Sequence, residues 1–228
     1  MDPFASSPAD PTSVPPPPPL TDRARIRAAY RDYLLRHGAP PTTVFALAET
    51  LGMSESAFYE HYATFEAIDR DIFRELFDQA RQRAEATPEY AAYSVREKLL
   101  AFYYTLIEGL RDERSYIQLK RQQRPFFNRP TPVYLQDAKL RFEQYADELL
   151  IEARMSKEVV RRAFLSDRYA AGFWYQLLFL LDFWLKDSSP NFERTDEAIE
   201  KAVTLSFDLI GRNPLDSAVE FARFLWQR

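Results

Sequence analysis

The sequence predicts an all-α protein of nine or ten helices, and three observations support this fold class. Beyond residue 20, apolar side chains recur at intervals of three and four residues, which is the helical period. No run of alternating apolar and polar residues indicates a strand, and no segment repeats at a fixed period. The 228 residues are 46% hydrophobic and suit one domain, or two small domains that share a core.

Residues 1–20 are expected to form a disordered, proline-rich tail. Eight of the 16 prolines lie in the first 19 residues, and the segment offers almost no apolar surface to bury. A plain flexible tail and a proline motif for a partner protein both fit this composition. The segment lacks the basic start and the apolar stretch of a signal peptide. Together with the absence of cysteine, this predicts a cytoplasmic protein.

Start and stop signals predict four helices in the next part of the chain. Thr21 or Asp22 can cap the first helix, which ends before Gly38. Gly52 ends the second helix, and Ser54 begins the third. The apolar stripe of the fourth, longer helix consists of Ile68, Ile72, Phe73, Leu76, Phe77 and Ala80. The expected helices cover residues 21–37, 43–51, 54–62 and 64–86.

The remaining helices follow from caps, apolar stripes and prolines. Ser94 and Glu97 form a capping box at the start of the fifth helix. Three prolines within residues 124–132 require a loop. Asn213 followed by Pro214 predicts the start of the last helix. The expected helices cover residues 94–110, 116–123, 133–154, 156–185, 195–211 and 213–227.

The composition excludes several kinds of site. Lys and Arg number 30 against 34 Asp and Glu, so the net charge is −4 and the chain carries no general basic coat for nucleic acid. Without cysteine there is no disulfide or thiolate zinc site, and two histidines are too few for an imidazole-rich metal site. The sequence has no glycine-rich phosphate loop and no Ser-His-Asp motif. We therefore expect no catalytic residues, no cofactor and no metal.

Residues 169–185 form the most apolar segment, which we expect in the core or in a dimer interface. The segment has 17 residues and contains Gln176 and Asp182, which places it at the lower limit for crossing roughly 30 Å of hydrocarbon. A helix that is apolar nearly all round is otherwise buried between other helices. We therefore expect no membrane span.

Residues 43–53 join two short helices through a glycine-containing turn, which is the spacing of a helix-turn-helix motif. The residues around it include Thr42-Thr43-Val44, Leu47-Ala48, Leu51-Gly52-Met53-Ser54, Phe58-Tyr59, His61-Tyr62 and Glu66-Ala67-Ile68. Over about residues 22–80, this order resembles the N-terminal domain of TetR-family regulators. The apolar helices that follow are similar to the ligand-binding and dimerisation domain of that family.

The resemblance implies an all-helical homodimer that binds operator DNA and a small molecule. In the family, ligand binding releases the protein from its operator. The implied domains are the tail at residues 1–20, a helix-turn-helix domain at residues 21–66, and a ligand-binding and dimerisation domain at residues 67–228. The helix over residues 64–86 bridges the last two.

The recognition helix implied by the resemblance is acidic. Residues 42–67 contain four Glu and no Lys or Arg, although DNA affinity depends largely on neutralising phosphates. Glu55 stands where the family usually has Lys, and Thr64-Phe65 stand where it has Ser-Lys. Glu55 or Glu60 can accept from a cytosine amine, and the arginines of the first helix are either phosphate contacts or a solvated face. The candidate DNA-binding residues are Arg23, Arg27, Thr43, Ser54, Glu55, Ser56, Tyr59 and His61.

Aromatic residues are frequent in the second domain. Several of them in one bundle suit a pocket for a flat or lipid-like apolar ligand, although aromatics at helical spacing also build cores. The candidate ligand-binding residues are Phe102, Tyr103, Phe127, Tyr134, Phe142, Trp174 and Tyr175. The basic residues Lys120, Arg121, Arg124 and Arg129 either hold an anionic headgroup or form a solvated face. The candidate dimer-interface residues are Phe173, Leu177, Leu180, Leu181 and Trp184.

Two functions follow from these observations. One is a ligand-responsive TetR-like transcriptional repressor that binds an apolar or aromatic small molecule. The other is a carrier or sensor of a lipid- or quinone-like metabolite that has the same fold and does not bind DNA. The acidity of residues 42–67 favours the second, and the frequency of regulators in the family favours the first, which is the function we expect.

Overall fold

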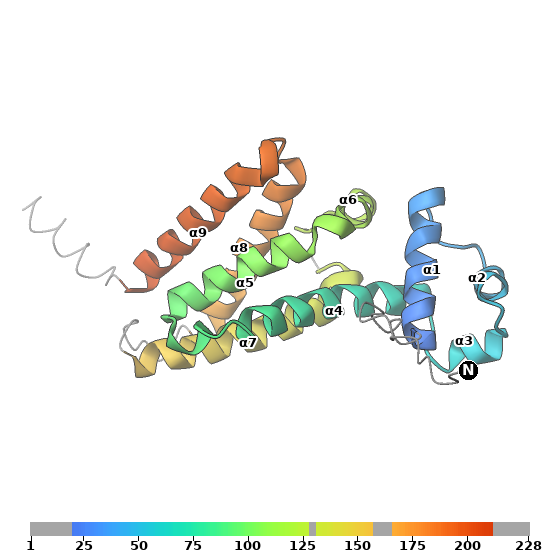
Figure 1. Ribbon diagram of the computed structural model, residues 1–228, viewed down its shortest axis with the longest axis horizontal. Helices are drawn as coiled ribbons and strands as arrows, with labels where there is room; N and C mark the ends of the chain where they lie inside the picture. Colours follow the sequence, from blue (N-terminus) through green and yellow to red (C-terminus); the bar gives the residue numbers. More distant parts are fainter. Residues whose placement is uncertain (1–19, 128–130, 157–165, 212–228) are drawn as a thin grey trace, which may run out of the picture.

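The computed structural model describes residues 20–127, 131–156 and 166–211, which fold as nine α-helices with four short 3₁₀ turns and no strand (Figure 1). The all-α prediction is confirmed. The helices are α1 (Asp22–His37), α2 (Val44–Leu51), α3 (Glu55–Tyr59), α4 (Phe65–Glu85), α5 (Val95–Gly109), α6 (Arg114–Gln123), α7 (Gln136–Met155), α8 (Ser166–Lys186) and α9 (Glu193–Gly211). No described helix is long and apolar enough to cross a membrane. The predicted tail and the predicted helix over residues 213–227 lie outside the described residues.

The first four helices begin at side-chain caps. Thr21, Thr43, Ser54 and Thr64 each accept a hydrogen bond from a backbone N–H three residues on, at 3.1–3.3 Å. Ser94 forms a capping box with Glu97 at the start of α5, as the sequence predicts. These caps use local contacts, and for this reason the sequence places the helix starts well.

The helix-turn-helix unit and the larger helical domain occupy different ends of the molecule. Helices α1, α2 and α3 pack together at one end, and α4 runs from there along the larger domain (Figure 1). Gly52 ends α2 with a φ of 64°, a left-handed conformation that favours glycine, and this turn directs the chain into α3. In the larger domain α4 packs against α5 and α7, and α8 packs against α7 and α9.

Helices α4 and α7 run parallel to each other. Three ion pairs join them, Arg70–Asp137, Asp78–Arg141 and Arg81–Glu148. The residue number rises on both helices from the first pair to the third, which fixes the direction. The intervening helices α5 and α6 provide the return path that a parallel arrangement requires.

A buried polar cluster connects α1, α4 and α6. The carboxylate of Asp69, which is 3% exposed, accepts hydrogen bonds from Tyr30 (3.1 Å), Tyr116 (2.6 Å) and Lys120 (2.7 Å). Lys120 is 8% exposed, so the two charges form a buried ion pair. Burial and the adjacent carboxylate raise the pKa of Tyr30 and of Tyr116 well above the usual range, which keeps both phenols protonated as donors. We call these four residues the Asp69 cluster.

Candidate DNA-binding surface and ligand pocket

Helix α3 is the element that would enter a DNA groove. Phe58 is fully buried, and its ring contacts those of Tyr62 and Phe65 with centroids 6.4 and 6.2 Å apart, which anchors α3 against the start of α4. On the opposite side Ser56 is exposed and Tyr59 is 52% exposed. The helix therefore presents a free face of about one and a half turns.

The other predicted contacts of the recognition unit lie around this face. Thr43 and Ser54 are exposed and act as the N-caps of α2 and α3. Glu55 is exposed in the first turn of α3, and His61 is half-buried just after it. Their use in DNA binding stays a prediction.

Arg23 and Arg27 are committed to an internal carboxylate. Asp71 on α4 is 3% exposed and accepts from Arg23 (2.9 Å), Arg27 (2.8 Å), Arg74 (2.6 Å) and the hydroxyl of Tyr62 (2.5 Å). Burial alone would raise the pKa of the Asp71 carboxyl, but these hydrogen bonds hold it well below its usual range. The two arginines therefore stabilise the contact between α1 and α4, which reduces their availability to a phosphate.

The remaining arginines of α1 are also paired. The pairs are Arg25 with Asp22, Arg31 with Glu113, and Arg36 with Asp32. By contrast, Glu49, Glu55 and Glu60 are exposed and form no ion pair within the described part of the chain. The helix-turn-helix face thus combines unpaired negative charge with arginines that already have carboxylate partners, an arrangement that weakens attraction to DNA.

Four of the predicted ligand-binding residues form one aromatic cluster in the core. Phe102, Tyr103, Phe142 and Trp174 are each at most 2% exposed. Their ring centroids lie 5.6–6.2 Å apart in the contacts Phe102–Phe142, Phe102–Tyr103, Tyr103–Phe142 and Phe142–Trp174. The Nε1 of Trp174 is buried and has no hydrogen-bond partner in the described structure. In this arrangement the four rings fill the space between them.

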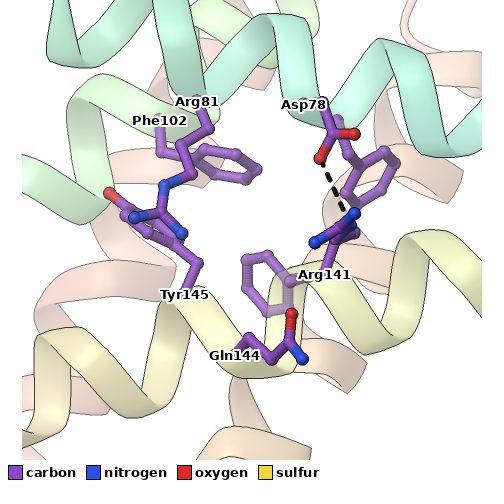
Figure 2. A pocket seen from close by; sticks show the side chains of 8 residues that line it. Asp78, Arg81, Phe102, Arg141, Gln144 and Tyr145 are labelled. Atoms are coloured by element: carbon purple, nitrogen blue, oxygen red, sulfur yellow. Dashed lines mark ion pairs between the residues drawn. The ribbon is translucent and has the colours of Figure 1, made fainter.

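A small cavity lies beside this cluster, between α4 and α7 (Figure 2). Its volume is about 70 Å³, which is the share of two or three waters in the liquid. The residues that line it are Phe77, Asp78, Arg81, Phe102, Arg141, Phe142, Gln144 and Tyr145. Figure 2 shows Arg81 with Tyr145 on one side of the cavity and Asp78 with Arg141 on the other. A ligand larger than a few waters requires these rings to separate.

The other three predicted ligand-binding residues lie elsewhere. Tyr134 is buried against Phe73, with ring centroids 5.0 Å apart, near the Asp69 cluster. Phe127 and Tyr175 are 50% and 42% exposed. Of the seven predicted residues, four therefore belong to the aromatic cluster, and two of these, Phe102 and Phe142, line the cavity beside it. Their use in ligand binding stays a prediction.

Of the basic residues near the proline loop, Lys120 and Arg124 line one small pocket together with Asp69 and Tyr134. Lys120 pairs with Asp69, and Arg121 pairs with Asp182 at 2.5 Å. Arg124 is exposed, and Arg129 lies outside the described residues. Asp182, the one acid of residues 169–185, therefore serves α6 as an ion-pair partner.

The predicted dimer-interface residues are in the core of a single chain. Phe173, Leu177, Leu180, Leu181 and Trp184 are each at most 4% exposed. Among the described side chains of α8 and α9, the large apolar ones that lie exposed are Tyr175, Phe179 and Leu205. A groove of about 440 Å³ is lined by Gln176, Phe179, Ala198, Lys201, Ala202 and Leu205. The predicted five residues already have packing partners, so a dimer contact would use the exposed face instead.

Asp69 and Asp71 are structurally central and were not predicted as site residues. A signal for Asp69 is present in the sequence, because it lies three residues before Ile72 and four before Phe73 and therefore falls on the apolar stripe of its helix. A carboxylate at such a position requires a buried partner. No comparable signal identifies the partners of Asp71.

The sequence matches a known family over more than half its length. The model of the tetracyclin repressor-like C-terminal domain family matches residues 98–225. A search of curated proteins finds no match.

Solved structures share the fold. Thermus thermophilus FadR, a TetR-family transcriptional repressor in complex with lauroyl-CoA, is 22% identical, covers 82% of this chain and 93% of its own, and superposes with a TM-score of 0.61. A protein of unknown function from Rhodococcus sp. RHA1 is 15% identical, with coverages of 86% and 99% and a TM-score of 0.58. A regulatory protein of the TetR family from Rhodococcus RHA1 is 18% identical, with coverages of 84% and 97% and a TM-score of 0.53.

Proposed function

This chain belongs to the TetR family of transcription regulators, and we propose that it is a dimeric repressor that leaves its operator when an apolar small molecule binds. The observation that carries this proposal is the continuity of α4 (Figure 1). At its start, Phe65 holds α3 through Phe58, and towards its end Phe77 contacts the aromatic cluster at Phe102 and Trp174. One helix therefore contacts both the recognition unit and the core in which a ligand would bind.

The aromatic cluster supports an apolar ligand. Its rings lie beside the cavity between α4 and α7, where Phe77, Phe102 and Phe142 supply apolar surface and Asp78, Arg81, Arg141 and Gln144 supply charged or amide groups. A small-molecule site needs apolar walls together with polar groups that orient the ligand. The likeness of fold to a repressor that binds lauroyl-CoA makes an acyl compound the first ligand to test.

The paired arginines favour a second candidate function. Carboxylates hold all the arginines of α1, and the recognition face is acidic. Few positive charges are therefore available to contact DNA phosphates. On this second proposal the protein is a carrier or sensor of an apolar metabolite that keeps the fold without binding DNA.

A mobility-shift assay with the DNA upstream of the protein's own gene distinguishes the two functions. At about 50 mM salt, where phosphate contacts are strongest, a repressor is expected to retard the DNA and to release it when lauroyl-CoA or another bound amphiphile is added. Binding should fall steeply as the salt concentration rises. Ligand binding without any DNA retardation at about 50 mM salt would support the carrier.

The dimer is expected to form through the exposed face of α8 and α9 rather than through the buried residues named above. The double variant Phe179→Glu with Leu205→Glu places two charges on that face and should convert the dimer to a monomer in light scattering at micromolar concentration. Leu140→Glu is the control, because Leu140 on α7 is 57% exposed and does not line the groove. If the double variant stays dimeric, the two-fold contact lies elsewhere.

A further inference from the structure

The cavity between α4 and α7 has a charged rim above an aromatic interior. Phe77, Phe102 and Phe142 supply the interior, and Arg81 and Arg141 supply the positive charge at the rim (Figure 2). The inference below rests on the proposed function, since it concerns the ligand of the same domain. It adds the chemical class of that ligand and the residue that binds its head.

The two arginines differ in how firmly they are held. Arg81 donates to Glu85 at 2.7 Å and to Glu148 at 2.6 Å, and its guanidinium lies 5.1 Å from the centroid of the Tyr145 ring. Burial alone would lower the pKa of Arg81, but the hydrogen bonds to both carboxylates raise it above its usual range. These contacts occupy the guanidinium of Arg81, so Arg81 is not available to bind the head of a ligand.

By comparison with Arg81, the guanidinium of Arg141 is available to bind the anionic head of a ligand. Its only described ion pair is with Asp78, whose nearest oxygen is 3.7 Å away, beyond hydrogen-bond distance. Asp78 is already neutralised by Arg74 on its own helix, at 2.8 Å. The side chain of Arg141 is 53% exposed, and exposed pairs of this kind contribute little. Arg141 can therefore turn from Asp78 to another anion without leaving a buried charge unpaired.

We propose that this cavity takes an anionic amphiphile, whose carboxylate or phosphate binds to the guanidinium of Arg141 and whose apolar part enters between Phe77, Phe102 and Phe142. A guanidinium matches either oxyanion through two parallel hydrogen bonds. A neutral apolar compound would use the rings and gain nothing from the cation.

The interior can open to admit the apolar part. Beside the cavity α4 and α7 are joined by Arg81–Glu148, whose side chains are 33% and 57% exposed, so separating the two helices here leaves both charges in contact with water. The cavity of about 70 Å³ then marks the point at which the rings separate when a ligand enters.

Isothermal titration with three eight-carbon compounds tests the proposal on the full chain. Octanoate, octyl phosphate and 1-octanol each have eight carbons in one unbranched chain and differ in their head, so the first two identify the oxyanion and the third is neutral. We expect at least one of the anions to bind about tenfold more tightly than 1-octanol. Arg141→Gln should remove that tenfold advantage and leave 1-octanol binding within about twofold.

Lys139→Gln is the matched control. It removes one positive charge from the same helix, and Lys139 does not line the cavity. It should leave all three affinities within about twofold. Equal binding of octanoate, octyl phosphate and 1-octanol, or anion binding that Arg141→Gln does not change, would overturn the proposal while leaving a ligand-responsive regulator intact. Failure of all three compounds to bind would count against both the proposal and an apolar ligand in this core, independently of whether DNA binds.

Discussion

Asp69→Asn is expected to lower the free energy of unfolding by about 3 to 5 kcal/mol, the usual cost of removing one partner from a buried ion pair. Asparagine keeps the shape of the side chain and can still accept from Tyr30 and Tyr116. It leaves Lys120, which is 8% exposed, without a counter-charge. Urea unfolding followed by far-ultraviolet circular dichroism measures the change. The surface substitution Glu148→Gln should cost less than about 1 kcal/mol in the same assay.

A second variant distinguishes the effect of losing the ion pair from general damage to the packing of α1, α4 and α6 around the Asp69 cluster. Asp69→Asn combined with Lys120→Met removes both charges and keeps an acceptor for Tyr30 and Tyr116, so this double variant should be more stable than Asp69→Asn alone. A loss below about 1 kcal/mol for Asp69→Asn would mean that Lys120 does not depend on this carboxylate.

Glu55→Lys with Glu60→Lys is expected to raise DNA affinity about a hundredfold at about 50 mM salt, roughly tenfold for each reversed charge, because each lysine adds a phosphate contact where a carboxylate now repels the backbone. The slope of affinity against salt should steepen by about 0.9 for each new contact. Fluorescence anisotropy with a labelled operator fragment measures both quantities. Phe65, a position where the family has Lys, is unsuitable for this test because its ring stacks on Tyr30 at 5.4 Å and a lysine there would disrupt the core.

The control for this experiment keeps the change in net charge and moves it elsewhere. Glu89→Lys with Glu108→Lys alters two exposed residues outside the helix-turn-helix unit. It should change DNA affinity far less than the recognition-helix variant. If both double variants raise affinity equally, the effect is one of net charge, and α3 does not approach DNA in the expected geometry.

The features that the sequence predicts well are local. Caps such as Thr43 and Ser54 act on backbone groups three residues away, and glycine ends α2 because of its own backbone freedom. The helix periods also bring Phe102, Phe142 and Trp174 to one core. Whether their rings leave room for a ligand depends on how three separate helices pack, and periodicity carries no information on that point.

The features that the sequence does not predict are long-range. Arg27 and Asp71 are 44 residues apart, and nothing local indicates that the arginine turns inward. The dimer face shows a different difficulty. Because α8 is apolar nearly all round, its period does not reveal which side is buried in the chain itself. The sequence therefore predicts Leu177 and Leu180 at a dimer interface, whereas in the structure both are buried within the chain.

The Asp69 cluster also has a consequence for the order in which the chain folds. Its hydrogen bonds join residues separated by 39, 47 and 51 positions, so Asp69 acquires its full set of partners only after residues 116 and 120 have been synthesised. A nascent chain that ends after α4 would leave the Asp69 carboxylate without its lysine and would expose Phe73 and Phe77 to water. The N-terminal half is therefore completed by the C-terminal half, and a fragment carrying the helix-turn-helix alone is an unfinished folding unit.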